Sequence, residues 1–223
     1  MENIVEKKHW SVAIRINHWA MAIAIFVLIG TGFLIAEPCT ILGGETSQKF
    51  FVGEVRFWHI LFGVLLAFLF LWRIYLAFFS QFKADWKDFL AFTYIPYTIQ
   101  QLKFYMLIDK NPPPHTGLYG PMQSIAYLGL LFMVFLIVIT GFILMGAGYH
   151  AAGFTAIMAT ILKPVENLLG GLATVRTIHH VLTWGFVLFI VVHIYMAFWY
   201  DAVLKEGTLS SMVTGNMFQK GKH

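Results

Sequence analysis

The chain has 223 residues, of which 59% are hydrophobic and 12% are charged, with a formal net charge of +4. Soluble domains carry about 25% charged residues, so this composition excludes an ordinary soluble protein and predicts a polytopic membrane protein. The single cysteine excludes an intramolecular disulfide and any zinc or iron–sulfur site built from cysteines alone. The basic residues form no stripe with exposed aromatic residues, so no nucleic-acid partner is expected.

Four apolar segments are long enough to cross a membrane as helices. We expect spans at about residues 16–36, 57–80, 121–148 and 177–200, because about 20 apolar residues cover the hydrocarbon core of a bilayer. Together they predict an all-α membrane protein, with residues 1–223 forming a single domain built as a bundle of four transmembrane helices in contact with membrane lipid. The first apolar run is too long for a cleavable secretion signal, so we expect this span to be retained.

The segments between the spans have different characters. Residues 83–110 mix charges with aromatic residues, which predicts an interfacial amphipathic segment between the second and third spans. Residues 150–176 predict a long extracytoplasmic loop before the fourth span, including a short surface piece that ends at Pro164. The third span contains no histidine, which predicts a packing or sealing role for it.

The distribution of lysine and arginine predicts the orientation. If the N-terminal and C-terminal polar tails both face the cytoplasm, 11 of the 15 lysine and arginine residues lie on the cytoplasmic side. This is the bias that the positive-inside rule describes. We therefore expect cytoplasmic N and C termini.

Four histidines lie near the ends of the expected spans. His18 is at the cytoplasmic end of the first span and His59 at the outer end of the second. His179 and His193 are 14 residues apart on the fourth span, which places them on one helix face and about 21 Å apart in depth. Depth therefore pairs His59 with His179, the outer pair, and His18 with His193, the inner pair. Imidazole inside a membrane usually indicates function, although hydrogen bonding between packed helices is the alternative.

Two imidazoles in each pair suit haem better than zinc. Zinc prefers four protein ligands, and no cysteine or carboxylate accompanies either pair. Haem iron takes its equatorial nitrogens from the porphyrin and needs only axial ligands from the protein. The sequence therefore predicts two haem b groups in a helical bundle, each with its iron bound by two histidines. They would be held non-covalently, because the chain has no C-x-x-C-H motif.

Arginines accompany these candidate ligands. Three of them each precede a candidate histidine by three residues, on the same helix face: Arg15, Arg56 and Arg176. Arginine can bind a haem propionate through two N–H groups, although anchoring at the membrane edge is the alternative for these three. Arg73 lies inside the second span at the inner level, where we expect it to serve the inner haem.

The other histidines are weaker candidates. His115 lies in the expected inner turn before the third span and is a candidate hydrogen-bond donor and proton source for a quinone. His180 is off the ligand face, but it would serve as a substitute ligand if the start of the helix were irregular. We expect the remaining three to be solvated or surface residues: His9, His150 and His223.

Several motifs resemble those of bacterial di-haem cytochromes b. The segment Arg15-Ile16-Asn17-His18-Trp19 resembles the R-x-x-H-W motif that opens the first span of these proteins. The segment Arg176-Thr177-Ile178-His179-His180, followed by His193-Ile194-Tyr195 and Asp201, looks like the fourth span of the nickel–iron hydrogenase cytochrome b subunit. The resemblance covers nearly the whole chain and fits the spacing of all four histidines.

The resemblance implies an electron-transfer subunit that is not catalytic alone, in a complex of the bacterial cytoplasmic (inner) membrane. The hydrogenase large (nickel–iron) and small (iron–sulfur) subunits would lie on the extracytoplasmic side. Electrons would enter at the outer haem, here His59 and His179, and leave from the inner haem, here His18 and His193. The acceptor would be a quinone, either menaquinone or ubiquinone.

Several alternatives remain open. Formate dehydrogenase and thiosulfate reductase use related cytochrome b subunits, and a free-standing cytochrome b561 would oxidise quinol for soluble acceptors. A histidine-based metal-ion transporter is a different class, but transporters usually show internal repeats and carboxylates in broken helices, which these spans lack. A purely structural anchor would leave four depth-matched histidines unexplained.

Overall fold

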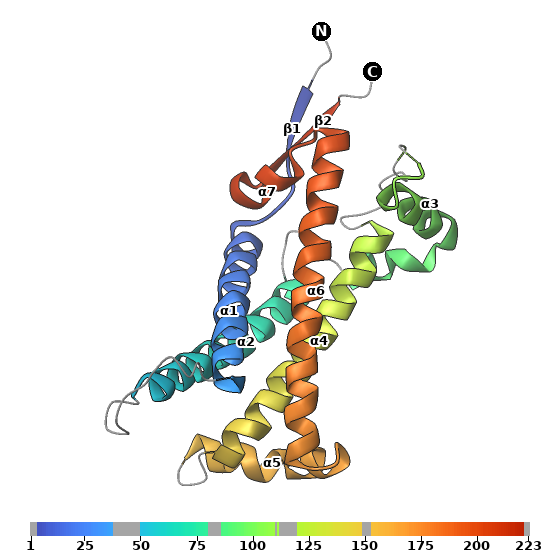
Figure 1. Ribbon diagram of the computed structural model, residues 1–223. Helices are drawn as coiled ribbons and strands as arrows, with labels where there is room; N and C mark the ends of the chain where they lie inside the picture. The colour runs from blue at the N-terminus through green and yellow to red at the C-terminus, as the bar shows by residue number, and fades with distance from the viewer. Residues whose placement is uncertain are drawn as a thin grey trace. The chain divides into compact units, whose positions relative to one another are not determined.

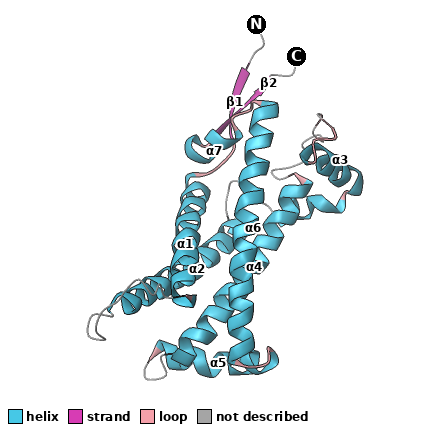
Figure 2. Cartoon of the chain, viewed as in Figure 1, coloured by secondary structure: helices cyan, strands magenta, loops and turns pink. Residues whose placement is uncertain are grey.

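The computed structural model describes residues 4–37, 50–79, 86–109, 111, 120–148 and 153–220. In this part of the chain the regular elements are helices and two short strands, joined by loops and turns (Figures 1 and 2). In chain order the elements are β1 (Ile4–Lys8), α1 (Val12–Ala36), α2 (Phe50–Phe79), η2 (Trp86–Thr93), α3 (Ile95–Tyr105), α4 (Pro121–Gly148), α5 (Phe154–Leu168), α6 (Leu172–Leu204), α7 (Thr208–Thr214) and β2 (Asn216–Lys220). The all-α membrane fold predicted from composition is confirmed.

Four helices among the described residues are long and apolar enough to cross a membrane. They are α1, α2, α4 and α6, with 25, 30, 28 and 33 residues, more than the roughly 20 that a hydrocarbon core requires. Three of them begin earlier than the expected spans: α1 at Val12, α2 at Phe50 and α6 at Leu172. The added turns carry the charged residues Arg15, Glu54, Arg56 and Arg176, which suit the headgroup region of a bilayer.

The chain divides into two compact units, and each contains segments of all four long helices. The first unit comprises Met1–His18, Trp72–Leu131 and Leu188–His223, and the second comprises Trp19–Leu71 and Phe132–Val187. The inner pair, His18 and His193, falls in the first unit, and the outer pair, His59 and His179, falls in the second. Each expected pair is therefore contained within one unit.

Within the first unit, α3 packs against α6 through aromatic side chains. Phe104 and Tyr105 of α3 form a buried cluster with Tyr200 of α6. The last carbonyl groups of a helix have no partner within that helix. Here the Tyr195 hydroxyl donates to the Tyr105 carbonyl at 2.9 Å. The Trp199 indole N–H donates to the Phe104 carbonyl at 3.2 Å. Burial raises the pKa of Tyr105 to about 12, so its phenol is neutral at physiological pH.

The first turn of α4 is held by η2 and α3. The side chain of Gln101 is 2% exposed, and its Oε1 accepts a hydrogen bond from the Met122 N–H at 2.7 Å. Ser124 Oγ accepts a hydrogen bond from the Phe92 N–H at 3.1 Å. Since the first N–H groups of a helix lack intrahelical partners, Gln101 acts as a cap supplied by a neighbouring helix. The described part of the expected interfacial segment is thus helical and closely packed.

The two ends of the chain form an antiparallel ribbon within the first unit. β1 and β2 pair along their full lengths, with Glu6 opposite Phe218, and Figure 1 shows the two strands side by side. Trp10, just after β1, donates its indole N–H to Ser211 Oγ of α7 at 3.1 Å. The sequence predicts only polar tails here, because strands of five residues with charged side chains carry no clear alternating pattern.

The segment between α4 and α6 contains a helix that continues through a proline. Pro164 lies inside α5, so the expectation that it ends this piece is wrong. A proline removes one backbone donor and crowds the preceding turn. In α5, the turn that follows is supported by an ion pair across the proline, with Lys163 Nζ 2.7 Å from Glu166 Oε1.

Candidate functional site

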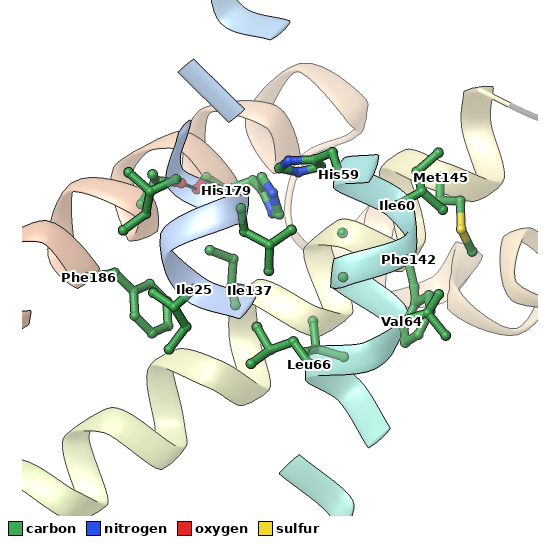
Figure 3. A pocket seen from close by; sticks show the side chains of 16 residues that line it. Ile25, His59, Ile60, Val64, Leu66, Ile137, Phe142, Met145, His179 and Phe186 are labelled. Carbon is green, nitrogen blue, oxygen red and sulfur yellow. Dashed lines mark hydrogen bonds between the residues drawn. The ribbon is translucent and has the colours of Figure 1, made fainter. Parts of the chain in front are cut away.

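An apolar pocket in the second unit is lined by segments of α1, α2, α4 and α6. Its empty space is about 700 Å³ when the open mouth is counted. Figure 3 shows the rings of His59 and His179 beside one another among its apolar side chains. The other lining residues are mostly aliphatic or aromatic: Ile25, Leu28, Ile29, Ile60, Gly63, Val64, Leu66, Ile137, Val138, Gly141, Phe142, Met145, Thr183 and Phe186.

The outer pair receives polar contacts from two further helices. The ring centroids of His59 and His179 are 6.3 Å apart, with an interplanar angle of 68°. Thr31 Oγ1 of α1 lies 2.8 Å from His59 Nδ1, and Thr140 Oγ1 of α4 lies 2.9 Å from His179 Nδ1. The third expected span, now α4, therefore does more than pack, because it supplies a hydrogen-bond partner to a candidate ligand.

Two glycines allow these rings to approach the neighbouring helices closely. A Cβ atom added at Gly32 would lie 3.3 Å from His59 Cε1, and one added at Gly141 would lie 3.4 Å from His179 Cε1. Each glycine directly follows the threonine that contacts the same ring. The sequence alone did not identify Thr31, Gly32, Thr140 or Gly141 as parts of the site. The available signal was the Thr-Gly dipeptide, which occurs once in the first span and once in the third.

The inner pair has a similar separation. The ring centroids of His18 on α1 and His193 on α6 are 6.2 Å apart, with an interplanar angle of 47°. Phe189, one turn before His193 on α6, stacks on that ring at 5.6 Å with planes 10° apart. The structure thus brings together the histidines of both pairs that depth alone predicts.

Two of the four candidate arginines are held in the first unit, together with the inner pair. Arg73 of α2 is 6% exposed, and its guanidinium carbon lies 4.8 Å from the ring centroid of Tyr127 on α4. Arg15 of α1 donates from Nη1 to the Val213 carbonyl of α7. The Nε of Arg15 is buried and has no hydrogen-bond partner among the described residues, so this nitrogen remains available to an acceptor.

The remaining candidates are not brought into close packing. Arg56 and Arg176 belong to the second unit, and both side chains are exposed. The ring of His180 lies edge-on to Phe33 with centroids 6.0 Å apart. The proposed quinone residue, His115, lies outside the described residues.

The geometry of both pairs fits a metal atom between two imidazoles. A metal–imidazole bond is about 2 Å long and each ring adds its own radius, so two rings bound to one metal have centroids about 6 Å apart. The observed separations are 6.2 Å and 6.3 Å. Among the described residues, no three His, Cys, Asp or Glu side chains converge into a larger ligand set. Two imidazoles in an apolar pocket, at the outer pair, fit haem. The inner pair also offers two imidazoles, and its unit contains Arg15 Nε, which is buried without a hydrogen-bond partner among the described residues.

Comparison with known proteins defines the class to which this fold and site belong. A family model described as "Prokaryotic cytochrome b561" matches residues 9–215. The chain therefore belongs to the prokaryotic cytochrome b561 family, whose members are b-type cytochromes, and haem b is the cofactor that this membership implies. With four apolar helices among its described residues, the chain is a multi-pass protein of the bacterial inner membrane.

Within this family the chain is similar to hydrogenase cytochromes. A relative from Cupriavidus necator, named "Probable Ni/Fe-hydrogenase B-type cytochrome subunit", is 32% identical, with 92% of this chain and 84% of the relative aligned. A relative of the same name from Bradyrhizobium diazoefficiens is 29% identical, with 92% and 83% aligned. The "Probable Ni/Fe-hydrogenase 1 B-type cytochrome subunit" of Escherichia coli K12 is 25% identical, with 96% and 92% aligned. The resemblance read from the sequence motifs is confirmed.

Proposed function

We propose that this chain is the membrane-anchoring cytochrome b subunit of a respiratory nickel–iron hydrogenase. It connects an extracytoplasmic iron–sulfur subunit, through two b haems, to a quinone such as menaquinone or ubiquinone, and it is not catalytic alone. The observation that carries this function is the occurrence of two histidine pairs in one chain, with centroids 6.2 Å and 6.3 Å apart. The hydrogenase names of the relatives favour this partner over formate dehydrogenase or thiosulfate reductase.

In this function the side chains of the chain hold and shield the cofactors. His59 and His179 would hold the iron of one haem, and His18 and His193 would hold that of the other. Haem supplies reversible one-electron chemistry, and the protein contributes ligand orientation and a dry, apolar surrounding. In the second unit the aliphatic and aromatic lining of the pocket provides that surrounding.

Arginines balance the negative charge of the haem propionates. Arg15 and Arg73 act at the inner haem, where Arg15 Nε has no hydrogen-bond acceptor among the described residues. Arg56 and Arg176 act at the outer haem from their exposed positions. His115 donates a hydrogen bond to the quinone and supplies a proton when the quinone is reduced.

The proposed orientation places both termini in the cytoplasm and the outer pair toward the hydrogenase subunits. It rests on the excess of lysine and arginine in the tails and in residues 73–110. A reporter that is active only in the cytoplasm, fused after His223, should be active. Activity from a periplasmic reporter at the same position would reverse the orientation.

The haem assignment is tested by counting haem per chain with a pyridine haemochrome assay. The wild-type chain should contain two b haems, and each of His18→Ala, His59→Ala, His179→Ala and His193→Ala should lose one. His180→Ala is the matched control, since it removes a neighbouring imidazole outside both pairs and should retain two. Haem content that is unchanged in the four variants would reject the ligand assignment.

The partner assignment is tested in membranes that contain the nickel–iron and iron–sulfur subunits. Hydrogen should reduce the cytochrome and then an added menaquinone or ubiquinone analogue, and the chain should purify together with both subunits. Reduction by formate in place of hydrogen, with co-purification of a molybdenum enzyme, would assign the chain to the related dehydrogenase class. His115→Ala should slow quinone reduction and leave the haem spectra unchanged.

A further inference from the structure

We propose that Thr31 and Thr140 are positioning residues for the outer pair, which accept hydrogen bonds from the Nδ1–H groups of His59 and His179 and leave both Nε2 atoms to bind iron. This inference rests on the proposed function, since it requires that the outer pair binds haem. It assigns a role in the site to α1 and α4, the two helices that contribute no outer-pair histidine.

The hydroxyl protons of both threonines are committed to their own helices. Thr31 Oγ1 donates to the Val27 carbonyl at 2.7 Å, and Thr140 Oγ1 donates to the Leu136 carbonyl at 2.8 Å. A hydroxyl has one proton to donate and lone pairs with which to accept. Towards the imidazole, each threonine oxygen is therefore an acceptor.

An acceptor at Nδ1 selects the tautomer of the ring. A neutral imidazole carries its proton on one nitrogen only, and the other nitrogen has the lone pair that a metal needs. With Thr31 2.8 Å from His59 Nδ1 and Thr140 2.9 Å from His179 Nδ1, the proton resides on Nδ1. Both Nε2 atoms then carry the lone pair before haem arrives, which removes the cost of selecting a tautomer during binding.

The residue after each threonine completes the same arrangement. Gly32 and Gly141 allow His59 Cε1 and His179 Cε1 to approach within 3.3 Å and 3.4 Å of where a Cβ atom would lie. Cε1 lies between the two ring nitrogens, so this close approach restricts rotation of the ring around its hydrogen bond. The Thr-Gly pair thus restrains both the tautomer and the ring plane, once on α1 and once on α4.

These contacts have a consequence for the electronic properties of the site. A hydrogen bond from Nδ1–H to an acceptor increases the basicity of the ligand nitrogen. A more basic ligand stabilises the oxidised, more positively charged iron. Thr31 and Thr140 should therefore lower the midpoint potential of the outer haem, and removing them should raise it.

The test uses the full-length chain with its haems and compares Thr31→Val/Thr140→Val with Thr31→Ser/Thr140→Ser. Valine keeps the shape and removes the hydroxyl, whereas serine keeps the hydroxyl. Thr177→Val is the matched control, because Thr177 Oγ1 makes the same type of bond to its own helix, at 3.2 Å to the Ala173 carbonyl. The readouts are haem per chain, the midpoint potential of the haem that is lost in His59→Ala, and its low-spin EPR spectrum.

In the valine variant we expect that potential to rise and the EPR g values to move, with a roughly 10- to 100-fold weaker haem affinity. In the serine variant the midpoint potential, the EPR g values and the haem affinity should return towards those of the wild type. Thr177→Val should leave all three properties unchanged. Valine and control variants with the same potential and EPR spectrum would overturn the inference. If the valine variant loses the haem completely, recovery of haem by serine supports the role and failure of serine to recover it overturns the role.

A different result is expected if the outer pair does not bind haem at all. In that case His59→Ala and His179→Ala would retain two haems per chain, whatever the threonine variants show. Loss of one haem in the histidine variants without any effect of the threonine hydroxyls would reject only the positioning role.

Discussion

At the scale of single residues, two glycines on α1 separate the effect of ring contact from the effect of helix propensity. A Cβ atom at Gly32 would lie 3.3 Å from His59 Cε1, whereas one at Gly30 would meet no described residue within 4 Å. Alanine favours a helix over glycine by about 1 kcal/mol at both positions. We expect Gly32→Ala to displace the His59 ring and change the EPR spectrum or occupancy of the outer haem, and Gly30→Ala to leave both unchanged.

Haem per chain and low-spin EPR spectra of the two variants, purified in parallel, check this expectation. If Gly30→Ala and Gly32→Ala behave alike, the close approach at Gly32 has no role in holding the ring. The comparison is well controlled, because the two glycines are two residues apart on the same helix and the substitution is identical.

At the scale of secondary-structure elements, the attachment of α3 to α4 depends on one buried amide. Gln101→Ala leaves the Met122 N–H, now bonded at 2.7 Å, without its acceptor. An unsatisfied buried donor costs about 1–3 kcal/mol, so the thermal unfolding midpoint in detergent should fall. Gln100→Ala is the control, since it removes the same side chain from the preceding, partly exposed position. Equal midpoints for the two variants would show that Gln101 does not cap α4.

The sequence predicts the long helices and the histidine pairs because both follow from local rules. Apolar length defines a span, and the helical rise assigns His18, His59, His179 and His193 to depths without reference to other helices. The structure adds what depends on contacts between helices. Thr140 contacts the ring of His179 because of the way α4 packs against α6. The sequence of α4 alone indicates only that Thr140 is a polar residue in an apolar helix.

Local rules also fail where a side-chain contact outweighs the pattern of the segment. Pro164 predicts a helix end, yet α5 continues to Leu168, with the Lys163–Glu166 ion pair across the proline. Residues 95–105 are amphipathic and predict a surface segment, but Gln101 is buried because it caps a different helix. In the first case the contact lies within α5 itself, and in the second it is made to a different helix, α4.

At the scale of the whole molecule, the ribbon of β1 and β2 ties the first residues of the chain to the last within the first unit. Gly215, just before β2, is needed there for two reasons. Its φ of 92° is in the left-handed region, and an added Cβ would lie 3.1 Å from the Trp10 carbonyl oxygen and 3.3 Å from Arg15 Cζ. A residue with a side chain is less stable than glycine in the left-handed conformation by about 1–2 kcal/mol. Gly215→Ala should therefore weaken the ribbon.

Weakening the ribbon should destabilise the haem site of the inner pair before that of the outer pair. Arg15, which contacts Val213 next to the ribbon, lies one turn before His18 on α1, and both belong to the first unit. His59, His179 and their threonines all belong to the second unit. On mild heating, Gly215→Ala should therefore lose the haem assigned to His18 and His193 first, as followed by the redox component that is absent in His18→Ala. Gly53→Ala, where a Cβ atom meets nothing within 4 Å among the described residues, should lose neither haem early. Simultaneous loss of both haems in Gly215→Ala would show instead that the joined ends stabilise the chain as one cooperative structure.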